Sequence, residues 1–194
     1  RVQLSYLLDN DANTIKKLHS ETKMIDGNFF THEYKPALKM IVVGAVHISQ
    51  GLVSMAKTLD IDVILVDPRT AYASEERFPD IDFITSWPDE ALKKIGINAS
   101  TAIVTLSHDP KLDDPALEIA VRSEAFYIAA LGSLKTQKER KKRLKEKGFS
   151  EDEIARIHGP AGLDIGALEP AEIALSILSE LVATRRAENI KGIA

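Results

Sequence analysis

The sequence predicts an α/β fold for residues 39–194, a Rossmann-like doubly wound parallel sheet. Three observations lead to this fold class. Short apolar runs recur along the chain, segments with the apolar spacing of helices separate them, and several of the runs end at a glycine or an aspartate. Continuous apolar runs are typical of parallel strands covered on both faces, and strand–helix alternation is typical of a doubly wound sheet.

Residues 1–38 are predicted to be β-rich, the remnant of a preceding domain. Val2–Leu8 has the pattern of a short strand, and Asp26-Gly27-Asn28 is a hairpin signal between two apolar pairs. Pro36 marks the predicted boundary. Because the chain begins with Arg1 and not with Met, we expect it to be part of a longer protein.

From Lys39 onward, each predicted element rests on a local pattern. The expected strands are Met40–Val43, Val63–Val66, Asp82–Thr85, Thr101–Leu106 and Ala125–Leu131. The expected helices are His47–Leu59, Pro88–Ile95, Pro115–Val121, Lys135–Lys147, Ser150–Ile157 and Pro170–Arg186. Proline at the first position and Asp113 or Asp114 as N-cap indicate the start of the third helix. Ser150 and Glu153 form a predicted capping box at the start of the fifth.

The composition limits the classes of function. The chain has 194 residues, 44% of them hydrophobic, and a formal net charge of −4, which gives no reason to expect a nucleic-acid partner. It contains no cysteine, which excludes disulfides, thiolate metal sites and cysteine nucleophiles. No apolar run reaches the roughly 20 residues that span a bilayer. We therefore expect a cytoplasmic protein without a metal site.

Ligands of doubly wound sheets bind beyond the carboxyl ends of the strands, near the point where strand order reverses. The first candidate there is the turn that contains Gly44, Ala45 and His47, where a helix N-terminus offers free N–H groups to a phosphate. Val46 stands where a dinucleotide fingerprint has its second glycine. The turn is either a degenerate nucleotide or anion site or a turn kept only for folding.

Two further candidates follow the second and fourth predicted strands. Asp67 lies near the offset of about 20 residues at which a carboxylate binds a ribose hydroxyl, and Arg69 could contact a phosphate. The alternative role of Asp67 is to cap the turn before Pro68. After the fourth strand, His108, Asp109 and Lys111 place an acid–base group, a carboxylate and a cation at the same edge. The alternative is an ordinary loop histidine.

The last candidates come from two glycine-containing segments. Gly132 and Ser133 form a strand-end turn before a strongly basic helix, whose charges are expected to form a solvated face. The alternative is that Lys135 or Arg140 helps to hold an anionic ligand or partner. Asp164 and Gly166 belong to Gly159–Gly166, a shaped loop that either closes over a ligand or returns the chain to the final helix.

Four strings in order resemble the C-terminal Rossmann-like domain of the XdhC/CoxI family, from about Lys39 to Arg186. They are VDPRTAYASEERFP, LSHDPKLDDPAL, FYIAALGS and HGPAGLDIGALEPAEIALSIL. The resemblance implies an accessory factor of xanthine dehydrogenase or carbon monoxide dehydrogenase. Such a factor binds molybdenum cofactor (molybdopterin), assists its sulfuration and inserts it into the apoenzyme.

The resemblance also implies the partners of the chain. They would be a molybdenum hydroxylase apoenzyme and a cysteine desulfurase or other sulfurtransferase, and the chain would be a cofactor chaperone and not a catalyst. The family turn reads G-A-G-H, so Gly44, Ala45 and His47 match and Val46 departs from it. An NAD(P)-dependent oxidoreductase is the alternative, with His108 and Asp109 as its local acid–base candidates. A scaffold with a vestigial site and a homodimer also remain open.

Overall fold

The computed structural model describes residues 19–25, 29–35, 37–72, 74 and 76–190, and it divides the chain into two compact units, residues 1–38 and 39–194. In the first unit, β1 (His19–Ile25) pairs antiparallel with β2 (Phe29–Lys35), with Met24 opposite Phe30. The predicted hairpin arms are therefore strands. The predicted turn at residues 26–28, the strand Val2–Leu8 and the boundary at Pro36 lie outside the described residues.

The second unit is built on a six-stranded parallel sheet in the order β5-β4-β3-β6-β7-β8. The strands are β3 (Lys39–Val43), β4 (Asp62–Val66), β5 (Asp82–Ile84), β6 (Thr101–Thr105), β7 (Tyr127–Ala130) and β8 (Ile157–His158). Strand order reverses between β3 and β6, which places the switch point of a Rossmann-like fold between these two strands. The predicted fold class is confirmed.

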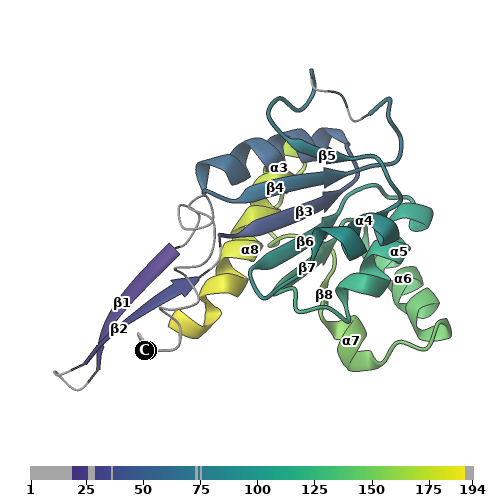
Figure 1. Cartoon of the computed structure of the whole chain (residues 1–194). Coiled ribbons are helices and arrows are strands. Elements are labelled where there is room, and N and C mark those ends of the chain that lie inside the picture. Colours follow the sequence, from purple (N-terminus) through teal and green to yellow (C-terminus); the bar gives the residue numbers. More distant parts are fainter. Residues whose placement is uncertain (1–18, 26–28, 36, 73, 75, 191–194) are drawn as a thin grey trace. The chain divides into compact units, whose positions relative to one another are not determined.

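Helices cover both faces of this sheet (Figure 1). They are α3 (His47–Thr58) and α8 (Pro170–Ile190) on one face, and α4 (Pro88–Ile95), α5 (Pro110–Ala120) and α6 (Leu134–Glu146) on the other, with the short α7 (Glu151–Ala155) after α6. Gly51 of α3 faces Ala174 of α8, where a built Cβ would lie 3.4 Å from the alanine methyl group. The small side chains let the two helices approach closely.

The core on the α4–α6 side begins with a row of isoleucines across the sheet. Ile41, Ile64, Ile103, Ile128 and Ile157 are register partners on five neighbouring strands. All but Ile64 are buried in one hydrophobic cluster with residues of α4, α5 and α6. This face explains why the strands read as continuous apolar runs, because both of their faces are covered.

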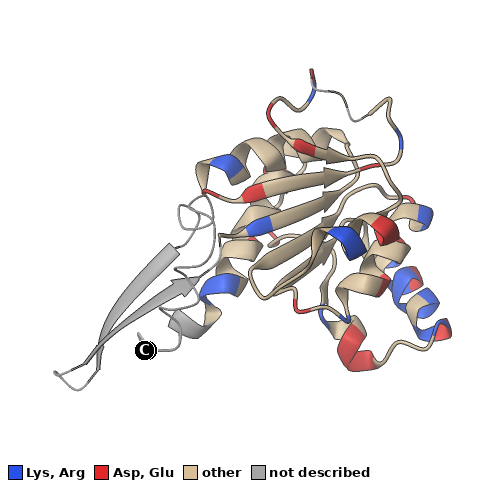
Figure 2. Ribbon diagram, viewed as in Figure 1, with Lys and Arg blue, Asp and Glu red and all other residues tan. Residues whose placement is uncertain are grey.

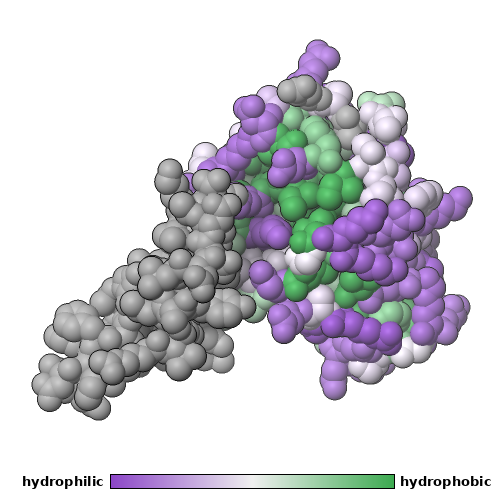
Figure 3. Space-filling view, viewed as in Figure 1, coloured by the Kyte–Doolittle hydropathy of each residue, from purple (hydrophilic) through white to green (hydrophobic). Residues whose placement is uncertain are grey.

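The side of the sheet seen in Figure 3 has a green apolar surface among the hydrophilic residues. Four of the partly buried residues that pack against the cluster are Ile64, Ile84, Ile95 and Ile97.

The described part of the β4–β5 connection, residues 67–72, 74 and 76–81, contains no helix. Phe78 from this connection is almost fully buried and meets the Phe83 ring edge-on at 5.8 Å on the opposite face.

Two predicted elements are corrected by the structure, while the final helix keeps its predicted start and runs to Ile190 instead of Arg186. The third helix begins at Pro110 and not at Pro115, because Asp109 accepts a hydrogen bond from the Lys111 amide (2.9 Å) and acts as N-cap. Asp113 and Asp114, predicted as caps, lie inside α5 and are buried. Pro115 lies inside the helix one turn after its start, where its missing N–H removes one backbone hydrogen bond.

The second correction concerns the sixth strand. Ile157, predicted to end a helix, begins β8, and its helix ends at Ala155. The capping box of Ser150 and Glu153 is confirmed, with reciprocal hydrogen bonds of 3.1 and 2.8 Å. A strand of two residues is too short to show an apolar alternation, so periodicity could not predict it.

Candidate functional site

The candidate site lies at the carboxyl edge of the sheet, where the turns after β3 and β6 meet. Gly44 follows β3 with φ +107°, and a Cβ built on it would lie only 2.8 Å from the backbone nitrogen of Ser107. Only glycine combines this backbone conformation with this close approach. The sequence therefore brings the two turns together at the switch point through the absence of one side chain.

The turn before α3 uses part of its own hydrogen-bonding capacity. Ser49 Oγ donates to Gly44 O (2.5 Å) and accepts from Val46 N (3.2 Å), while Ala45 N donates to Asp67 Oδ2 (2.7 Å). The α3 helix then begins at His47, which is exposed, with no acidic residue in its first turn. Ser49 N donates to Val46 O (3.1 Å), so the amides of the first two helical residues, His47 and Ile48, are the ones without an acceptor in the helix and are candidate donors for an anion.

Asp67 is fully buried at the end of β4 and its two oxygens are each engaged twice. Oδ1 accepts from Arg69 N and Nε, both at 2.9 Å. Oδ2 accepts from Ala45 N at 2.7 Å and Arg69 Nη2 at 2.8 Å. Burial alone would raise the pKa of the Asp67 carboxyl, but the hydrogen bonds from Arg69 and Ala45 lower it below its usual value. Asp67 is held as a carboxylate by the protein's own donors.

Two arginines fix the connection that follows Asp67. The Arg69 guanidinium lies 4.6 Å from the centre of the Tyr72 ring, and its side chain keeps 35% of its surface exposed. Arg77 Nη1 donates to Ala45 O (3.0 Å) and to Tyr72 O (2.7 Å), which fastens the connection to the turn after β3. Arg77 was not among the residues singled out from the sequence, because nothing local marks its contact with Ala45.

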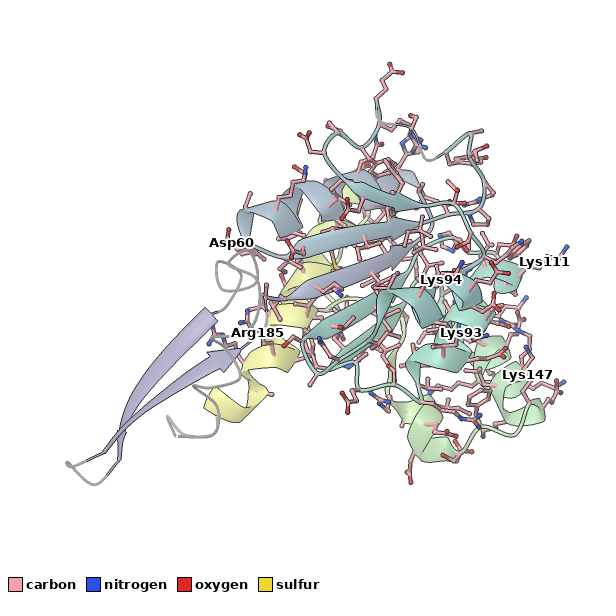
Figure 4. All side chains as sticks on the ribbon, in the orientation of Figure 1. Asp60, Lys93, Lys94, Lys111, Lys147 and Arg185 are labelled. Atoms are coloured by element: carbon pink, nitrogen blue, oxygen red, sulfur yellow. The ribbon has the colours of Figure 1, made fainter. Side chains whose placement is uncertain are left out.

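The turn after β6 presents His108 to solvent. His108 adopts φ +61°, a left-handed conformation that few residues other than glycine take. The next residues are the N-cap Asp109, partly buried, and the exposed Lys111 in the first turn of α5. Figure 4 shows the labelled Lys111 side chain directed away from the ribbon. His108 and Lys111 are therefore accessible to a ligand, while one oxygen of Asp109 already caps the helix.

Gly132 and Ser133 lie beside this turn, because Leu131 N donates to Thr105 O (2.9 Å) across the ends of β7 and β6. Gly132 adopts φ +139°, and a Cβ on it would meet the Thr136 methyl group at 2.8 Å. Ser133 is the N-cap of α6 and accepts from Thr136 N at 3.2 Å. Ser133 thus caps the start of the helix, Gly132 precedes it, and the serine remains exposed at the edge of the sheet.

The glycine-rich loop is anchored at one end and exposed at the other. Gly162 N donates to Glu180 Oε2 (2.9 Å), and a Cβ on Gly162 would overlap Ser176 Oγ of α8. Asp164 and Gly166 lie beyond this anchor, on an exposed stretch. Within the described residues, no hydrogen bond joins Asp164 to the turns after β3 or β6. The structure thus brings the first four candidate segments together and leaves Asp164 and Gly166 exposed on the loop before α8.

Sequence reasoning missed a cluster on α8 that supports this loop. Glu180 Oε2 accepts from the Tyr127 hydroxyl (2.6 Å), and Glu180 Oε1 lies 3.0 Å from Nδ1 of His158. Burial first, and then the hydrogen bond to Glu180, raise the pKa of Tyr127. The three members of this cluster, Glu180, Tyr127 and His158, come from three different segments, and no spacing in the sequence could indicate that they meet.

Two further findings concern the described residues as a group. They contain no group of three or more histidine, cysteine, aspartate or glutamate side chains that could hold a metal ion. None of the helices in this part of the chain has the length and apolar character needed to cross a membrane.

Comparisons with known proteins agree on one family. The model of the XdhC Rossmann domain matches residues 40–181. A Bacillus subtilis protein, named as a probable subunit of xanthine dehydrogenase, is 29% identical over 180 residues, which are 92% of this chain and 52% of that protein. The Escherichia coli protein named molybdenum cofactor insertion chaperone PaoD is 28% identical over 158 residues, which are 81% of this chain and 43% of that protein.

A solved structure is also similar to this chain. A crystal structure from Bacillus halodurans, described as a xanthine dehydrogenase, has a TM-score of 0.71 and 30% identity. The match covers 84% of this chain and 48% of that one. The chain thus spans about half the length of the curated relatives it matches.

Proposed function

This chain belongs to the XdhC family, as the four strings predicted, and from that premise we propose that it is a maturation factor of molybdenum hydroxylases. In this role it binds molybdenum cofactor as cargo and assists its sulfuration and its insertion into the apoenzyme. The name of the PaoD relative, a molybdenum cofactor insertion chaperone, supports insertion as the task. The xanthine dehydrogenase names of the other relatives support a molybdenum hydroxylase as the client.

The observation that carries the proposal is the set of donors at the switch point. At one edge of the sheet lie His47, which is exposed at the start of α3, the partly exposed Arg69, and the exposed His108 and Lys111. Hydrogen-bond donors and cations suit the phosphate of a pterin cofactor. The nearby carboxylate of Asp67 is neutralised by Arg69, so the pair would not repel that phosphate, and the excess positive charge of this edge comes from Lys111. These residues fit the cargo, and Gly132 and Ser133 border the same edge.

The state of Asp67 gives less support to the alternative, an NAD(P)-dependent oxidoreductase. A carboxylate at this strand end would have to accept hydrogen bonds from ribose hydroxyls, but all four contacts of Asp67 are made within the protein. A ribose would have to displace Arg69. Val46, partly buried at the start of α3, puts a β-branched side chain where the backbone would approach a pyrophosphate.

The decisive experiment is co-elution of purified molybdenum cofactor with the chain in gel filtration, read out by molybdenum content and by pterin fluorescence after oxidation. We expect retention by the wild type and a clear loss with Lys111→Ala. Lys94→Ala is the matched control, because Lys94 is an exposed lysine in the last turn of α4.

Absence of cofactor retention by the wild type would contradict the proposal. Tight binding of NADH, followed by its fluorescence during titration, together with turnover would favour the oxidoreductase instead. A pull-down of a molybdenum hydroxylase apoenzyme and of a cysteine desulfurase tests the two proposed protein partners separately.

A further inference from the structure

A buried ion pair lies beneath the candidate site, between α5 and α6. Asp113 is 1% exposed and Arg140 is 2% exposed, and Asp113 Oδ2 lies 3.5 Å from Arg140 Nη2. Arg140 belongs to the basic helix whose exposed charges are coloured blue in Figure 2. The sequence favours a solvated face for the charges of this helix and leaves Arg140 open as a contact for an anion, but Arg140 lies on the buried side. Gln137 precedes it there by three positions and Leu144 follows it by four.

The acidic member of the pair holds the turn after β6. Asp113 Oδ1 accepts a hydrogen bond of 2.6 Å from Ser107 Oγ, and Ser107 Oγ accepts one of 3.1 Å from Asp109 N. His108, with its positive φ, stands between these two anchored residues. The orientation of the His108 side chain therefore depends on the hydrogen bond between Ser107 and Asp113.

The basic member holds the end of β7 and the segment after β8. Arg140 Nη2 donates to Leu131 O (3.0 Å), and Nη1 donates to Gln137 Oε1 (2.5 Å). Gln137 Nε2 in turn donates to Ala130 O (2.8 Å). A Cβ on Gly159 would overlap Gln137 Oε1, so this segment packs directly on the glutamine. One network thus touches three of the loops at the carboxyl edge.

Stability alone does not account for this arrangement. Within the described residues, Asp113 Oδ2 and Arg140 Nε are buried without a hydrogen bond. Burial raises the pKa of Asp113 and lowers the pKa of Arg140, in both cases against the attraction between the two groups. Well-packed apolar side chains in place of such a pair are often as stable or more stable. What apolar side chains would not supply is the fixed direction of the hydrogen bonds to Ser107 and Leu131.

We propose that Asp113 and Arg140 are positioning residues, which hold the 107–109 turn and the 131–133 turn in a fixed relation and thereby shape the cargo site. The cargo part of this inference rests on the proposed function. Neither residue reaches the ligand, because both are buried; they act through Ser107, His108 and the backbone of Leu131.

The structure offers a matched control for the test. Asp114 and Arg143 join the same two helices, with Asp114 Oδ1 accepting from Arg143 Nη2 at 2.9 Å. No hydrogen bond links this second pair to either turn within the described residues, and Arg143 keeps 33% of its side chain exposed. Asp113→Asn and Asp114→Asn therefore remove one carboxylate each from neighbouring positions of α5. Only Asp113 accepts a hydrogen bond from a turn residue, so only the first change replaces the carboxylate partner of Ser107 by a neutral amide.

The experiment measures amide hydrogen exchange and cofactor affinity of the full chain at a temperature where circular dichroism shows each variant folded. With Asp113→Asn we expect faster exchange of the amides of residues 107–109 and 131–133, and an affinity for purified molybdenum cofactor lower by about tenfold. With Asp114→Asn we expect wild-type exchange in these turns and wild-type affinity. Ser107→Ala keeps the ion pair but removes its contact with the turn, and it should reproduce the result of Asp113→Asn at residues 107–109.

The two readouts separate this inference from the proposed function. Unchanged exchange in Asp113→Asn and Ser107→Ala would overturn the positioning role whether or not the chain binds the cofactor. If Asp113→Asn and Ser107→Ala exchange faster but bind the cofactor as tightly as the wild type, the link to the cargo site would be overturned. Absence of cofactor binding by the wild type contradicts the proposed function, and the exchange data then decide the positioning role alone.

Discussion

Asp67 occupies the position of the ribose-binding carboxylate of dinucleotide-binding proteins, but its oxygens bind other groups of the same protein. It lies at the end of β4, where a dinucleotide-binding protein presents a carboxylate to ribose, but Arg69 and the amide of Ala45 occupy both of its oxygens. The local sequence Asp-Pro-Arg makes this possible, because Arg69 is close enough in the chain to fold back. The residue joins the turn after β3 to the connection after β4.

Asp67→Asn is expected to reduce the free energy of unfolding at pH 7 by about 1–3 kcal/mol, because it removes charge-assisted hydrogen bonds from a buried site. The pKa of Asp67 is lower in the folded protein than its ordinary value of 3.8. Its contribution is therefore present above about pH 4 and disappears as the pH falls through the folded-state pKa. Urea unfolding at pH 7 and at stepwise lower pH measures both effects.

As the pH falls through this range, the free energy of unfolding of Asp67→Asn should decrease less than that of the wild type. Asp82→Asn, at an exposed aspartate that begins β5, is the control and should leave the acid profile as in the wild type. Equal acid profiles for wild type and Asp67→Asn would contradict the assigned role.

Gly44→Ala tests the contact at the switch point. We expect it to lower the free energy of unfolding by about 2–4 kcal/mol, the sum of the strain of positive φ and the clash with Ser107. Gly96→Ala is the control, since Gly96 has φ +73° and no atom within 4 Å of a built Cβ. Chemical denaturation of the two variants separates the clash from the strain. A loss in Gly44→Ala no greater than in Gly96→Ala would show that the two turns can move apart freely.

At the scale of elements, the two corrected predictions have different causes. The sequence around α5 offers two starts with the same local signals, a proline preceded by an aspartate, at Pro110 and at Pro115. The structure uses the first, so that Asp113 and Asp114 fall on the buried side of the helix and meet Arg140 and Arg143 of α6. For β8, the two residues are defined as a strand only by their pairing with β7.

Asp109→Ala tests the start of α5. We expect a loss of about 1 kcal/mol in the free energy of unfolding, the usual effect of removing an N-cap side chain. Thermal or urea unfolding measures it, and Asp164→Ala, at an exposed loop aspartate, should remain within experimental error of the wild type. A neutral Asp109→Ala would favour a helix that starts at Pro115 after all.

At the scale of the whole molecule, residues 39–194 contain the complete parallel sheet and its hydrophobic core. We therefore expect residues 39–194, expressed alone, to unfold cooperatively and to keep the α/β circular dichroism of the sheet and its helices. A thermal scan followed in the far and near ultraviolet checks this. A chain that lacks a cooperative transition would show that residues 1–38 are needed for this unit to fold.

Much of the placement of the candidate site was predictable, because parallel strands bring their carboxyl ends to one edge. Gly44, Asp67, His108 and Gly132 were each found from their position after an apolar run, without knowledge of their contacts. What each of them contacts was not predictable in the same way. Sequence position placed Asp67 at a ligand edge, but only the fold shows that its oxygens are taken by Arg69.

The sequence by itself determined the strand–helix alternation, most element boundaries to within one residue, and the family, because apolar periodicity, capping residues and motif strings are local properties of the chain. The tertiary structure decided the strand order, the two-residue β8, the start of α5 and the burial of Asp113 with Arg140. It also decided that Glu180 gathers Tyr127, His158 and Gly162. These features depend on contacts between segments far apart in the chain, which burial and hydrogen bonding select only when the sheet has formed.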